Sequence, residues 1–302
     1  MTAYTSHLAA EIATQPDDWA AALARVEEAR AVLPRPGESV AVVGCGTSYY
    51  MAQSYAVLRE QAGDLGGRTD AYAASEFPAG RSYDHVVAIS RSGTTTEVIA
   101  LLTALRERGQ RTTAVVATEG TAIPDLATHA LMLPEVDEQS VVQTRFATTT
   151  LMLLRATLGE DLTGAIEDAR AVLAEDEASA LAGVADAEQL TFVGRGWTIG
   201  LANEAALKLR ESAQFWTESY PAMEYRHGPI SIATSGRATW AFGEVPEGLA
   251  ADVRATGAHF EHRDTDPVAD LVRLHRLCLL KAARAGVDPD EPRHLSRSII
   301  LS

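Results

Sequence analysis

The clearest indication of the fold class is the sequence Val40-Ala41-Val42-Val43-Gly44-Cys45-Gly46-Thr47-Ser48. Its first four residues are apolar and rich in valine, and such a run is too short for a helix but typical of a buried parallel strand. Glycine and hydroxyl residues end the run, and a helical pattern follows to about residue 60. A sequence similar to the one that begins at Val42 occurs 150 residues later (192 − 42), as Phe192-Val193-Gly194-Arg195-Gly196-Trp197. This repeat predicts a duplicated α/β unit.

Short apolar runs elsewhere predict the other strands, and helical patterns separate them. The expected strands are 40–43, 86–89, 113–117, 130–133, 190–193, 239–242 and 259–262. The expected helices are 17–33, 48–60, 97–108, 142–158, 163–187, 199–215, 249–256 and 267–285, the first of them capped by Asp17 or Asp18. Alternation of strand and helix indicates an α/β fold, with parallel sheets flanked by helices in three flavodoxin-like layers.

This pattern predicts five successive parts of the chain. They are an N-terminal helical segment (1–35), a first α/β domain with loops that suit a phosphate (36–160), a helical connector (161–187), a second α/β domain (188–286) and a C-terminal tail (287–302). Because no Gly/Ser-rich linker separates the halves, we expect them to pack tightly.

The charge balance excludes two classes of partner. The chain has 26 basic and 41 acidic residues and a formal net charge of −15, so neither a nucleic acid nor an anionic membrane surface is expected. No apolar run reaches the roughly 18 residues of a membrane span, and the start of the chain does not resemble a signal peptide. Cys45 and Cys278 are far apart and lack metal-ligand spacing, so we expect a cytoplasmic protein with no metal or other cofactor.

Hydroxyl side chains and glycine are concentrated in the loops that follow two of the predicted strands. Thr47 and Ser48 follow the first strand, and Ser90-Arg91-Ser92-Gly93-Thr94-Thr95-Thr96 follows the second. A helix N-terminus with such donors suits a phosphate. One such loop alone would favour simple helix capping, but two at corresponding strand ends favour a phosphate site. A dinucleotide site is a weaker interpretation, because Tyr49 stands where the third glycine of that motif belongs.

An ordered set of motifs carries a resemblance to a known family. They are Gly44-Cys45-Gly46-Thr47-Ser48, Ala74-Ser75-Glu76-Phe77, Ser90-Arg91-Ser92-Gly93-Thr94-Thr95, 204–211, Glu224-Tyr225-Arg226-His227-Gly228-Pro229 and 288–298. From about Pro34 to Ser302 the chain resembles the double-SIS (sugar isomerase) family, which includes the isomerase half of glucosamine-6-phosphate synthase, SIS-type glucosamine-6-phosphate deaminases, galactosamine-6-phosphate deaminase-isomerases and fructosamine-6-phosphate deglycases. The resemblance implies two tandem SIS subdomains.

The resemblance also implies a role for each matching residue. Glu211 matches the carboxylate that moves a proton between C1 and C2 of the sugar, Lys208 the lysine one turn earlier, and His227 the ring-opening histidine, which in the family enters from a neighbouring subunit. The residues that match phosphate-binding positions are Ser48, Ser90, Arg91, Ser92 and Thr95. The other expected substrate contacts are Cys45, Gly46, Thr47, Val142, Ser296 and Arg297. The expected partners are a phosphosugar substrate and a second copy of the chain in a homodimer that shares His227.

The chemistry of these residues agrees with such roles. Lys208 and Glu211 are three residues apart on one helix face, where an ammonium keeps a carboxylate ionised and stabilises an enediolate or enolamine. A solvated surface ion pair is the competing interpretation, which the apolar neighbours weaken. His227 stands in a loop context, where an exposed histidine without function is common.

Three departures from the synthase pattern bear on the activity. Thr2, and not a cysteine nucleophile, follows Met1, so we expect no glutaminase activity. Arg297 stands where the synthase has a Schiff-base lysine, and arginine is no amine nucleophile. Thr94 replaces a glutamate that some relatives have, with no consequence that we can name. We therefore expect an aldose–ketose isomerase and deaminase acting on an amino-sugar phosphate, with a fructosamine-6-phosphate deglycase as the second enzyme and a non-catalytic sugar-phosphate sensor as the alternative of another class.

Overall fold

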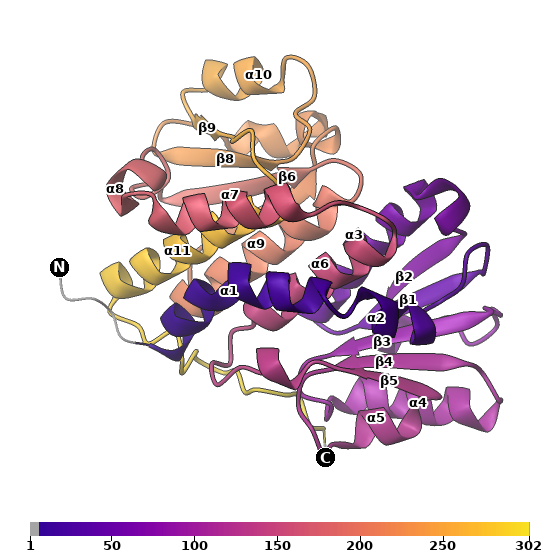
Figure 1. Ribbon diagram of the computed structural model, residues 1–302. Helices are drawn as coiled ribbons and strands as arrows, with labels where there is room; N and C mark the ends of the chain where they lie inside the picture. Colours follow the sequence, from indigo (N-terminus) through magenta and orange to yellow (C-terminus); the bar gives the residue numbers. More distant parts are fainter. Residues whose placement is uncertain (1–5, 302) are drawn as a thin grey trace. The chain divides into compact units, whose positions relative to one another are not determined.

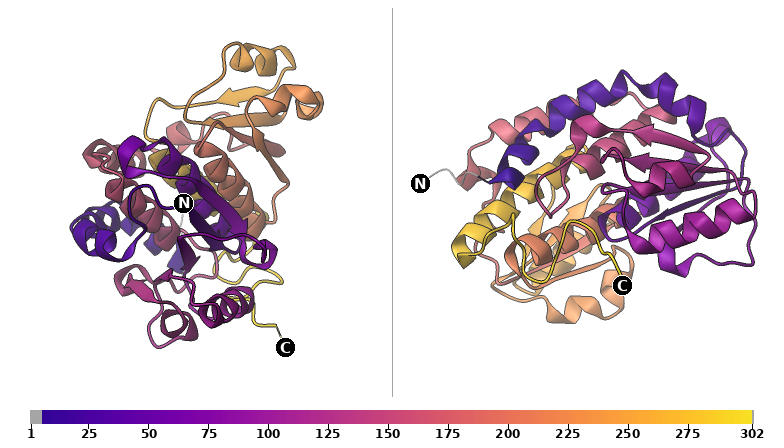
Figure 2. Two further views of the ribbon diagram at one scale, coloured as in Figure 1. Left: turned by 90° about the vertical axis from the view of Figure 1, so that its right-hand side faces the viewer. Right: turned by 90° about the horizontal axis from the view of Figure 1, so that it is seen from below.

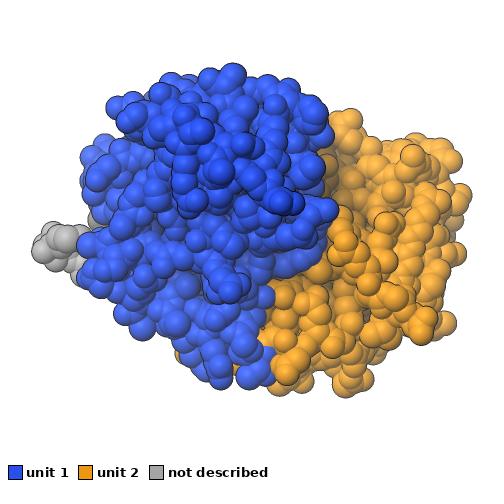
Figure 3. Space-filling model, turned by 90° about the horizontal axis from the view of Figure 1, so that it is seen from above, with its two compact units in different colours: residues 1–16, 139–144, 163–295 blue, residues 17–138, 145–162, 296–302 orange. Residues whose placement is uncertain are grey.

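The computed structural model describes residues 6–301 and places them in two units. Unit 1 comprises 1–16, 139–144 and 163–295, and unit 2 comprises 17–138, 145–162 and 296–302, as coloured in Figure 3. Each unit contains one parallel sheet with helices on its faces, which confirms the predicted α/β fold. In the part of the chain described here, no helix is both long and apolar enough to cross a membrane.

Unit 2 is built on a five-stranded parallel sheet in the order β2-β1-β3-β4-β5. Its strands are β1 (Val40–Gly44), β2 (Thr69–Ala73), β3 (His85–Ser90), β4 (Thr112–Val116) and β5 (His129–Met132). Helix α3 (Thr47–Gln61) packs on one face with α6 (Arg145–Thr157) beside it, and α4 (Thr96–Glu107) and α5 (Ala122–Leu126) lie on the other face (Figure 1). The central strands β1, β3 and β4 are buried along their whole length.

Unit 1 is built on a four-stranded parallel sheet in the order β7-β6-β8-β9. Its strands are β6 (Gln189–Gly194), β7 (Thr217–Pro221), β8 (Arg237–Phe242) and β9 (His259–Glu261). Its helices are α7 (Thr163–Ala174), α8 (Glu177–Ala180), α9 (Thr198–Ala213), α10 (Leu249–Ala255) and α11 (Pro267–Ala285). The order repeats that of the first four strands of unit 2, and residues 286–301 follow α11 without helix or strand (Figure 2).

The glycine turn after the first strand is also repeated. A Cβ on Gly44 would lie 2.8 Å from the Cβ of Ser48, and a Cβ on Gly194 would lie 2.2 Å from the carbonyl oxygen of Thr198. Each first glycine therefore lets a helix start directly against its strand. The second glycines, Gly46 and Gly196, have φ of 54° and 58°, which L side chains rarely adopt.

The N-terminal helix differs from the expectation. The predicted helix 17–33 is two helices, α1 (His7–Leu23) and α2 (Val26–Val32), so neither Asp17 nor Asp18 is an N-cap. Buried side chains at positions 8, 12, 15 and 19 continue one helix face through Pro16. That spacing outweighs the single backbone hydrogen bond that proline removes.

Two further helix predictions were too long, and two strands were missed. Helix α6 starts at Arg145 and not at 142, and the predicted helix 163–187 ends as α7 at Ala174 and resumes briefly as α8. The missed strands β2 and β7 are both edge strands, half-buried and rich in polar residues, so neither shows an apolar run.

Candidate functional site

The hydroxyl-rich loops lie at the point of unit 2 where strand order reverses. Strand β1 pairs with β2 on one side and β3 on the other, so the loops after β1 and β3 are neighbours at the carboxyl edge of the sheet. Ligands of open α/β sheets bind at such a switch point. Thr47 and Ser48 are buried in the first turn of α3, and Ser90 and Ser92 are buried in the second loop. The structure thus brings the predicted phosphate-binding hydroxyls to one edge.

Helix capping does not account for these hydroxyls. The N-cap residues of α3 and α4 are Gly46 and Thr95, and neither makes a side-chain cap hydrogen bond. The Oγ of Ser90 is buried and has no hydrogen-bond partner among the described residues. A buried hydroxyl without a partner is costly unless a ligand or water meets it. This arrangement can therefore receive an oxyanion.

The guanidinium of Arg91 contacts Glu138 and the tail instead of the hydroxyl side chains of the loop. The side chain is 1% exposed, with Nη1 3.4 Å from Oε2 of Glu138 and Nη2 donating to the carbonyl oxygen of Arg297 at 3.0 Å. Its own carbonyl accepts the backbone N–H groups of Ala117 and Thr118. Arg91 thus ties the loop to Glu138 and to the tail, and its contact with a phosphate remains a prediction.

The last residues of the tail lie against the second loop, within unit 2. Arg297 is held by the carboxylate of Asp137, by the carbonyl of Glu138 and by Oγ1 of Thr118. Arg297 therefore orients the tail here, and its expected contact with the substrate remains a prediction.

Two serines continue the contact between the tail and the loop. Ser298 Oγ lies 3.2 Å from Ser92 Oγ and 3.5 Å from Thr95 Oγ1, whereas Ser296 is exposed and bonds to the carbonyl of Ser298. Ser298 joins the hydroxyl cluster, although it was not among the predicted site residues. The backbone also takes part, since the N–H of Thr96 in the first turn of α4 donates to the carbonyl of Ile299 at 3.2 Å.

Cys45 has the properties of a packing residue. It is half-buried, and burial together with the nearby Glu97 carboxylate raises the pKa of its thiol. A protonated thiol is a poor nucleophile.

Unit 1 carries the predicted proton-transfer residues on one face of α9. Lys208 Nζ lies 2.6 Å from Oε2 of Glu211 and 3.5 Å from Oε1 of Glu204. The side chains of Lys208 and Glu204 are each 1% exposed, whereas that of Glu211 is 21% exposed. This burial excludes the solvated surface pair. Glu204 was missed, although its position four residues before Lys208 is a signal that could have found it.

Two titratable side chains near Lys208, those of His275 and Cys278, are held in their neutral forms. Burial, reinforced by the Lys208 ammonium, lowers the pKa of His275 to about 3, and Gln15 Nε2 lies 3.2 Å from its Nδ1. Burial raises the pKa of the Cys278 thiol to about 12. Neither His275 nor Cys278 therefore adds a charge to this region.

The two remaining predicted residues of unit 1 stand apart from α9 in sequence. His227 is exposed at the end of a 3₁₀ turn (Glu224–His227), and Gly228 follows with φ of 135°. Val142 is buried, and its carbonyl accepts a hydrogen bond from Ser140 Oγ at 2.8 Å. Among residues 6–301, no group of three or more His, Cys, Asp or Glu side chains is arranged to hold a metal ion.

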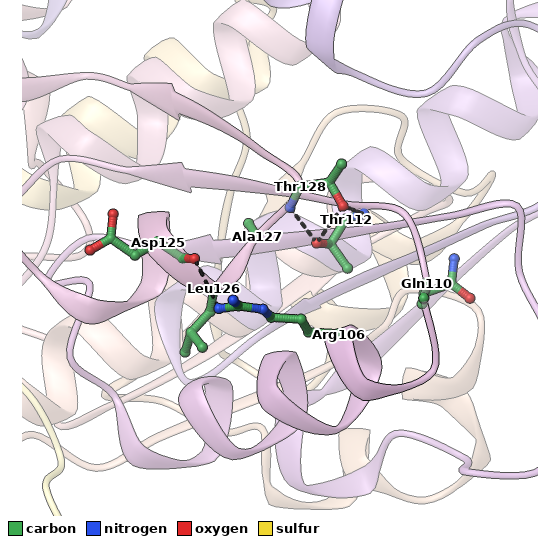
Figure 4. Close-up of a pocket in the computed structure, with 8 residues that line it drawn as sticks. Arg106, Gln110, Thr112, Asp125, Leu126, Ala127 and Thr128 are labelled. Atoms are coloured by element: carbon green, nitrogen blue, oxygen red, sulfur yellow. Dashed lines mark hydrogen bonds between the residues drawn. The ribbon is translucent and has the colours of Figure 1, made fainter.

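A polar pocket of about 350 Å³ lies near the opposite edge of the sheet of unit 2 (Figure 4). In it, Thr112 and Thr128 each donate a backbone N–H to the other's Oγ1, and Arg106 donates to the carbonyl of Asp125. None of the predicted site residues lines this pocket.

Comparison with known proteins supports the resemblance drawn from the motifs. The family model of the SIS domain matches residues 35–158. The glutamine–fructose-6-phosphate aminotransferase (isomerizing) of Pyrobaculum aerophilum is 28% identical over 99% of this chain and 58% of its own length. The enzyme of the same name from Methanothermobacter thermautotrophicus is 30% identical over 94% of this chain and 54% of its own. The chain spans about half the length of these curated relatives.

Solved structures show the same fold. Glucosamine-6-phosphate deaminase from Thermotoga maritima has a TM-score of 0.81 at 23% identity, covering 98% of this chain and 100% of its own. Tagatose-6-phosphate ketose/aldose isomerase from Escherichia coli has a TM-score of 0.79 at 16% identity, covering 94% and 95%. These likenesses show the fold, and the match of the SIS domain model to residues 35–158 confirms the resemblance for that part of the chain.

Proposed function

Because residues 35–158 form a SIS domain, we propose that this chain is a phosphosugar isomerase and deaminase that acts on an amino-sugar phosphate. An example is the conversion of glucosamine 6-phosphate and water to fructose 6-phosphate and ammonia. The names of its relatives support the substrate class. The single observation that carries the proposal is Lys208, buried between the carboxylates of Glu204 and Glu211.

The phosphate is assigned to the loops of unit 2. Ser48, Ser90, Ser92 and Thr95 offer hydroxyl donors around two helix N-termini, which supply the positive potential that a chain of net charge −15 lacks as a whole. Arg91 adds a charge behind the loop. Ser90 carries this assignment, because its buried hydroxyl is without a protein partner among the described residues.

Proton transfer is assigned to Glu211. In open-chain glucosamine 6-phosphate its carboxylate removes the C2 proton while the C1 carbonyl oxygen takes a proton from water, which gives an enolamine. The proton then returns at C1, which leaves an iminium at C2. Water adds to C2 and ammonia leaves, giving fructose 6-phosphate. Partial exposure of Glu211 leaves it open to a substrate, while Lys208 Nζ, 2.6 Å from Oε2, holds the carboxylate in position.

Lys208 also stabilises charge, because its ammonium is buried and already oriented when the enolamine forms. Glu204 orients Lys208 from the other side. A sensor needs phosphate loops but no such set, and a buried lysine with two carboxylates is costly to keep for structure alone. The set therefore favours an enzyme.

Further parts of the proposal rest on the resemblance. His227 opens the sugar ring and reaches the site of a second copy in a homodimer, and its exposure suits that role. Val142 contributes a backbone contact near the sugar hydroxyls. The sheet of unit 1, whose strand order and glycine turn repeat those of unit 2, is proposed as a second SIS subdomain.

The test is a product assay on the purified chain. It is incubated separately with glucosamine 6-phosphate, galactosamine 6-phosphate and a fructosamine 6-phosphate conjugate, and ammonia, free amine and hexose phosphates are followed. We expect turnover of at least one substrate, lost in Glu211→Gln and retained in Glu188→Gln, an exposed carboxylate of unit 1. If no substrate turns over but phosphosugars still raise the melting temperature of the chain, the enzyme proposal is wrong and the chain is a non-catalytic sensor.

A further inference from the structure

A second pocket of unit 2, of about 150 Å³, lies at the amino edge of the sheet, away from the phosphate loops. Arg59 in its wall donates to the carbonyls of Glu38 and Gly67, each of which stands two residues before a strand, β1 or β2. The phosphate loops follow β1 and β3 at the carboxyl edge of the same sheet. None of the predicted site residues lines this pocket. A ligand bound here would therefore be separate from the substrate of the proposed reaction.

The pocket is cationic although the chain is acidic. The side chains of Arg30, Arg35 and Arg59 line it, and no aspartate or glutamate does. Tyr55 also lines it and stays neutral, because burial raises the pKa of its phenol to about 12. Guanidinium groups pair well with carboxylate and phosphate, so the pocket favours an anion.

The three guanidinium groups differ in how far their donors are already used. Arg59 is 1% exposed and gives its N–H groups to three backbone carbonyls and one threonine hydroxyl, at 2.8 to 3.2 Å. Arg30 is paired with Glu27 and donates to two carbonyls at the end of α6. The guanidinium of Arg35 makes no hydrogen bond or ion pair with any residue that the structure describes. Arg35 is therefore the group that can bind a ligand directly.

The backbone holds Arg35 in place beside the pocket. Pro34 and Pro36 flank it, so the chain has little conformational freedom on either side. The carbonyl of Arg35 accepts a hydrogen bond from Arg59 Nη2 at 2.8 Å, and its N–H donates to Oε2 of Glu38 at 2.8 Å. The loop is thus fixed, and its guanidinium offers the two parallel N–H groups that bind one carboxylate.

The helix ends around the pocket favour a single negative charge over two. The last residues of α2, α3 and α6, or the residues next to them, line it. The carbonyls at a helix C-terminus carry a partial negative charge, which Arg30 and Arg59 offset by donating to carbonyls here. A phosphate dianion would add more negative charge than the remaining guanidinium balances, so a carboxylate fits better.

The rest of the wall is mostly apolar. Leu33, Tyr55 and Leu158 contribute to it, and so does Leu65, a leucine that is 44% exposed. A cavity of this volume has room for one benzene ring. Contact with an apolar group is favourable because it removes the exposed leucine from water.

We propose that this pocket binds a small monocarboxylate, whose carboxylate pairs with Arg35 and whose apolar body, about the size of one ring, lies against Leu65 and Tyr55. The proposal depends neither on Glu211 nor on the phosphate loops. Helix α3 joins the two sites, since it begins with Thr47 and Ser48 and carries Arg59 in its last turn. An occupant of the pocket would thus contact the helix that carries two of the predicted substrate-binding hydroxyls.

The test measures binding of benzoate to the full chain by calorimetry. Benzyl alcohol serves as an uncharged ligand of similar size, and phenyl phosphate as a ligand that is mostly dianionic at neutral pH. For a ligand this small we expect a Kd of about 1 mM for benzoate, and binding at least tenfold weaker for the other two.

Variants locate the binding site. Arg35→Gln should raise the Kd for benzoate tenfold or more without lowering the melting temperature, because its guanidinium has no partner to lose among the described residues. Leu65→Asn should also weaken binding of benzoate. Arg108→Gln, which changes an exposed arginine at the end of α4, should leave the Kd unchanged.

Several results would overturn the inference. Absence of benzoate binding, or equal affinity for benzoate and benzyl alcohol, would show that the pocket does not select a carboxylate. Tighter binding of phenyl phosphate would contradict the preference for a single charge. An unchanged Kd in Arg35→Gln, or loss of benzoate binding in Ser90→Ala, would place the benzoate elsewhere. None of these results bears on the proposed function, which turnover of phosphosugars tests separately.

Discussion

The ammonium of Lys208 lies 2.6 Å from the carboxylate of Glu211, one turn further along α9, and the lysine side chain is almost completely buried. Glu204 approaches the same ammonium from the previous turn, at 3.5 Å. Removal of one member of such a buried set leaves an uncompensated charge and strongly lowers the stability of the fold.

Lys208→Met should therefore destabilise the chain. It leaves the buried Glu204 carboxylate without its cation, and we expect a loss of about 3–5 kcal/mol in the free energy of unfolding. Urea denaturation of the wild type and the variant measures it. Adding Glu204→Gln to Lys208→Met should recover much of the loss. A single variant as stable as the wild type would show that the Lys208 charge does not balance Glu204.

Ser90→Ala should weaken phosphosugar binding without unfolding the chain. Its hydroxyl has no partner among the described residues, so its removal costs the fold little, whereas a hydrogen bond to a charged ligand contributes about 1.5–3 kcal/mol. We expect Kd for a sugar 6-phosphate to rise about 10- to 100-fold by calorimetry. Thr103→Ala, an exposed hydroxyl on α4, is the control. If Ser90→Ala and the wild type bind the sugar 6-phosphate with equal affinity, Ser90 does not contact the phosphate.

The phosphate loop should be intolerant of a side chain at Gly93. Its φ is 65°, and a Cβ there would lie 1.9 Å from Oγ1 of Thr121. Gly109 has φ of 66° but no heavy atom of the described residues within 4 Å of such a Cβ. The two alanine variants therefore share the backbone strain and differ in the steric clash. Gly93→Ala should have the lower melting temperature, and similar melting temperatures would contradict the packing described for this loop.

Stability should fall as the pH drops below 6.5, partly through His275. Burial and Lys208 lower its pKa to about 3, so between the unfolded value and that pKa the unfolded chain binds a proton that the folded chain does not. Folding is thus favoured above about pH 6.5, and the advantage is lost towards pH 3.

His275→Asn isolates this contribution, because Asn can still accept a hydrogen bond from Gln15. Across pH 4.5–6.5 the wild type should lose stability more steeply than the variant, by up to about 1.4 kcal/mol per pH unit. The free energy of unfolding at several pH values tests it, and parallel curves would contradict a buried, neutral His275. His85 remains in both proteins, so its lowered pKa of about 4 cancels in the comparison.

The sequence predicted the buried strands well, because runs such as Val40–Val43 have an apolar pattern that few other structures share. It missed β2 and β7, whose edge positions permit polar residues, and it placed a cap at Asp17 inside what is one continuous helix. Local pattern does not report whether a strand lies at the edge or in the middle of its sheet.

For the site, the family resemblance pointed to Lys208 and Glu211, and their spacing on one face of α9 agreed with it. One turn earlier, the same spacing would have given Glu204. The place of Ser298 depends on where the tail lies, some 80 residues after α9. No helical or strand period connects segments so far apart, so only the folded chain brings them together.

Deuterium labelling of the substrate shows whether Glu211 transfers the proton. Glucosamine 6-phosphate deuterated at C2 and a fructosamine 6-phosphate conjugate deuterated at C1 are incubated with the wild type and with Glu211→Gln, and the label is followed by NMR. We expect the wild type to move deuterium from that carbon, to its neighbour or to water, and Glu211→Gln to leave the label in place. Label retained by the wild type while the sugar is bound, or lost equally in Glu211→Gln, would contradict proton transfer by Glu211.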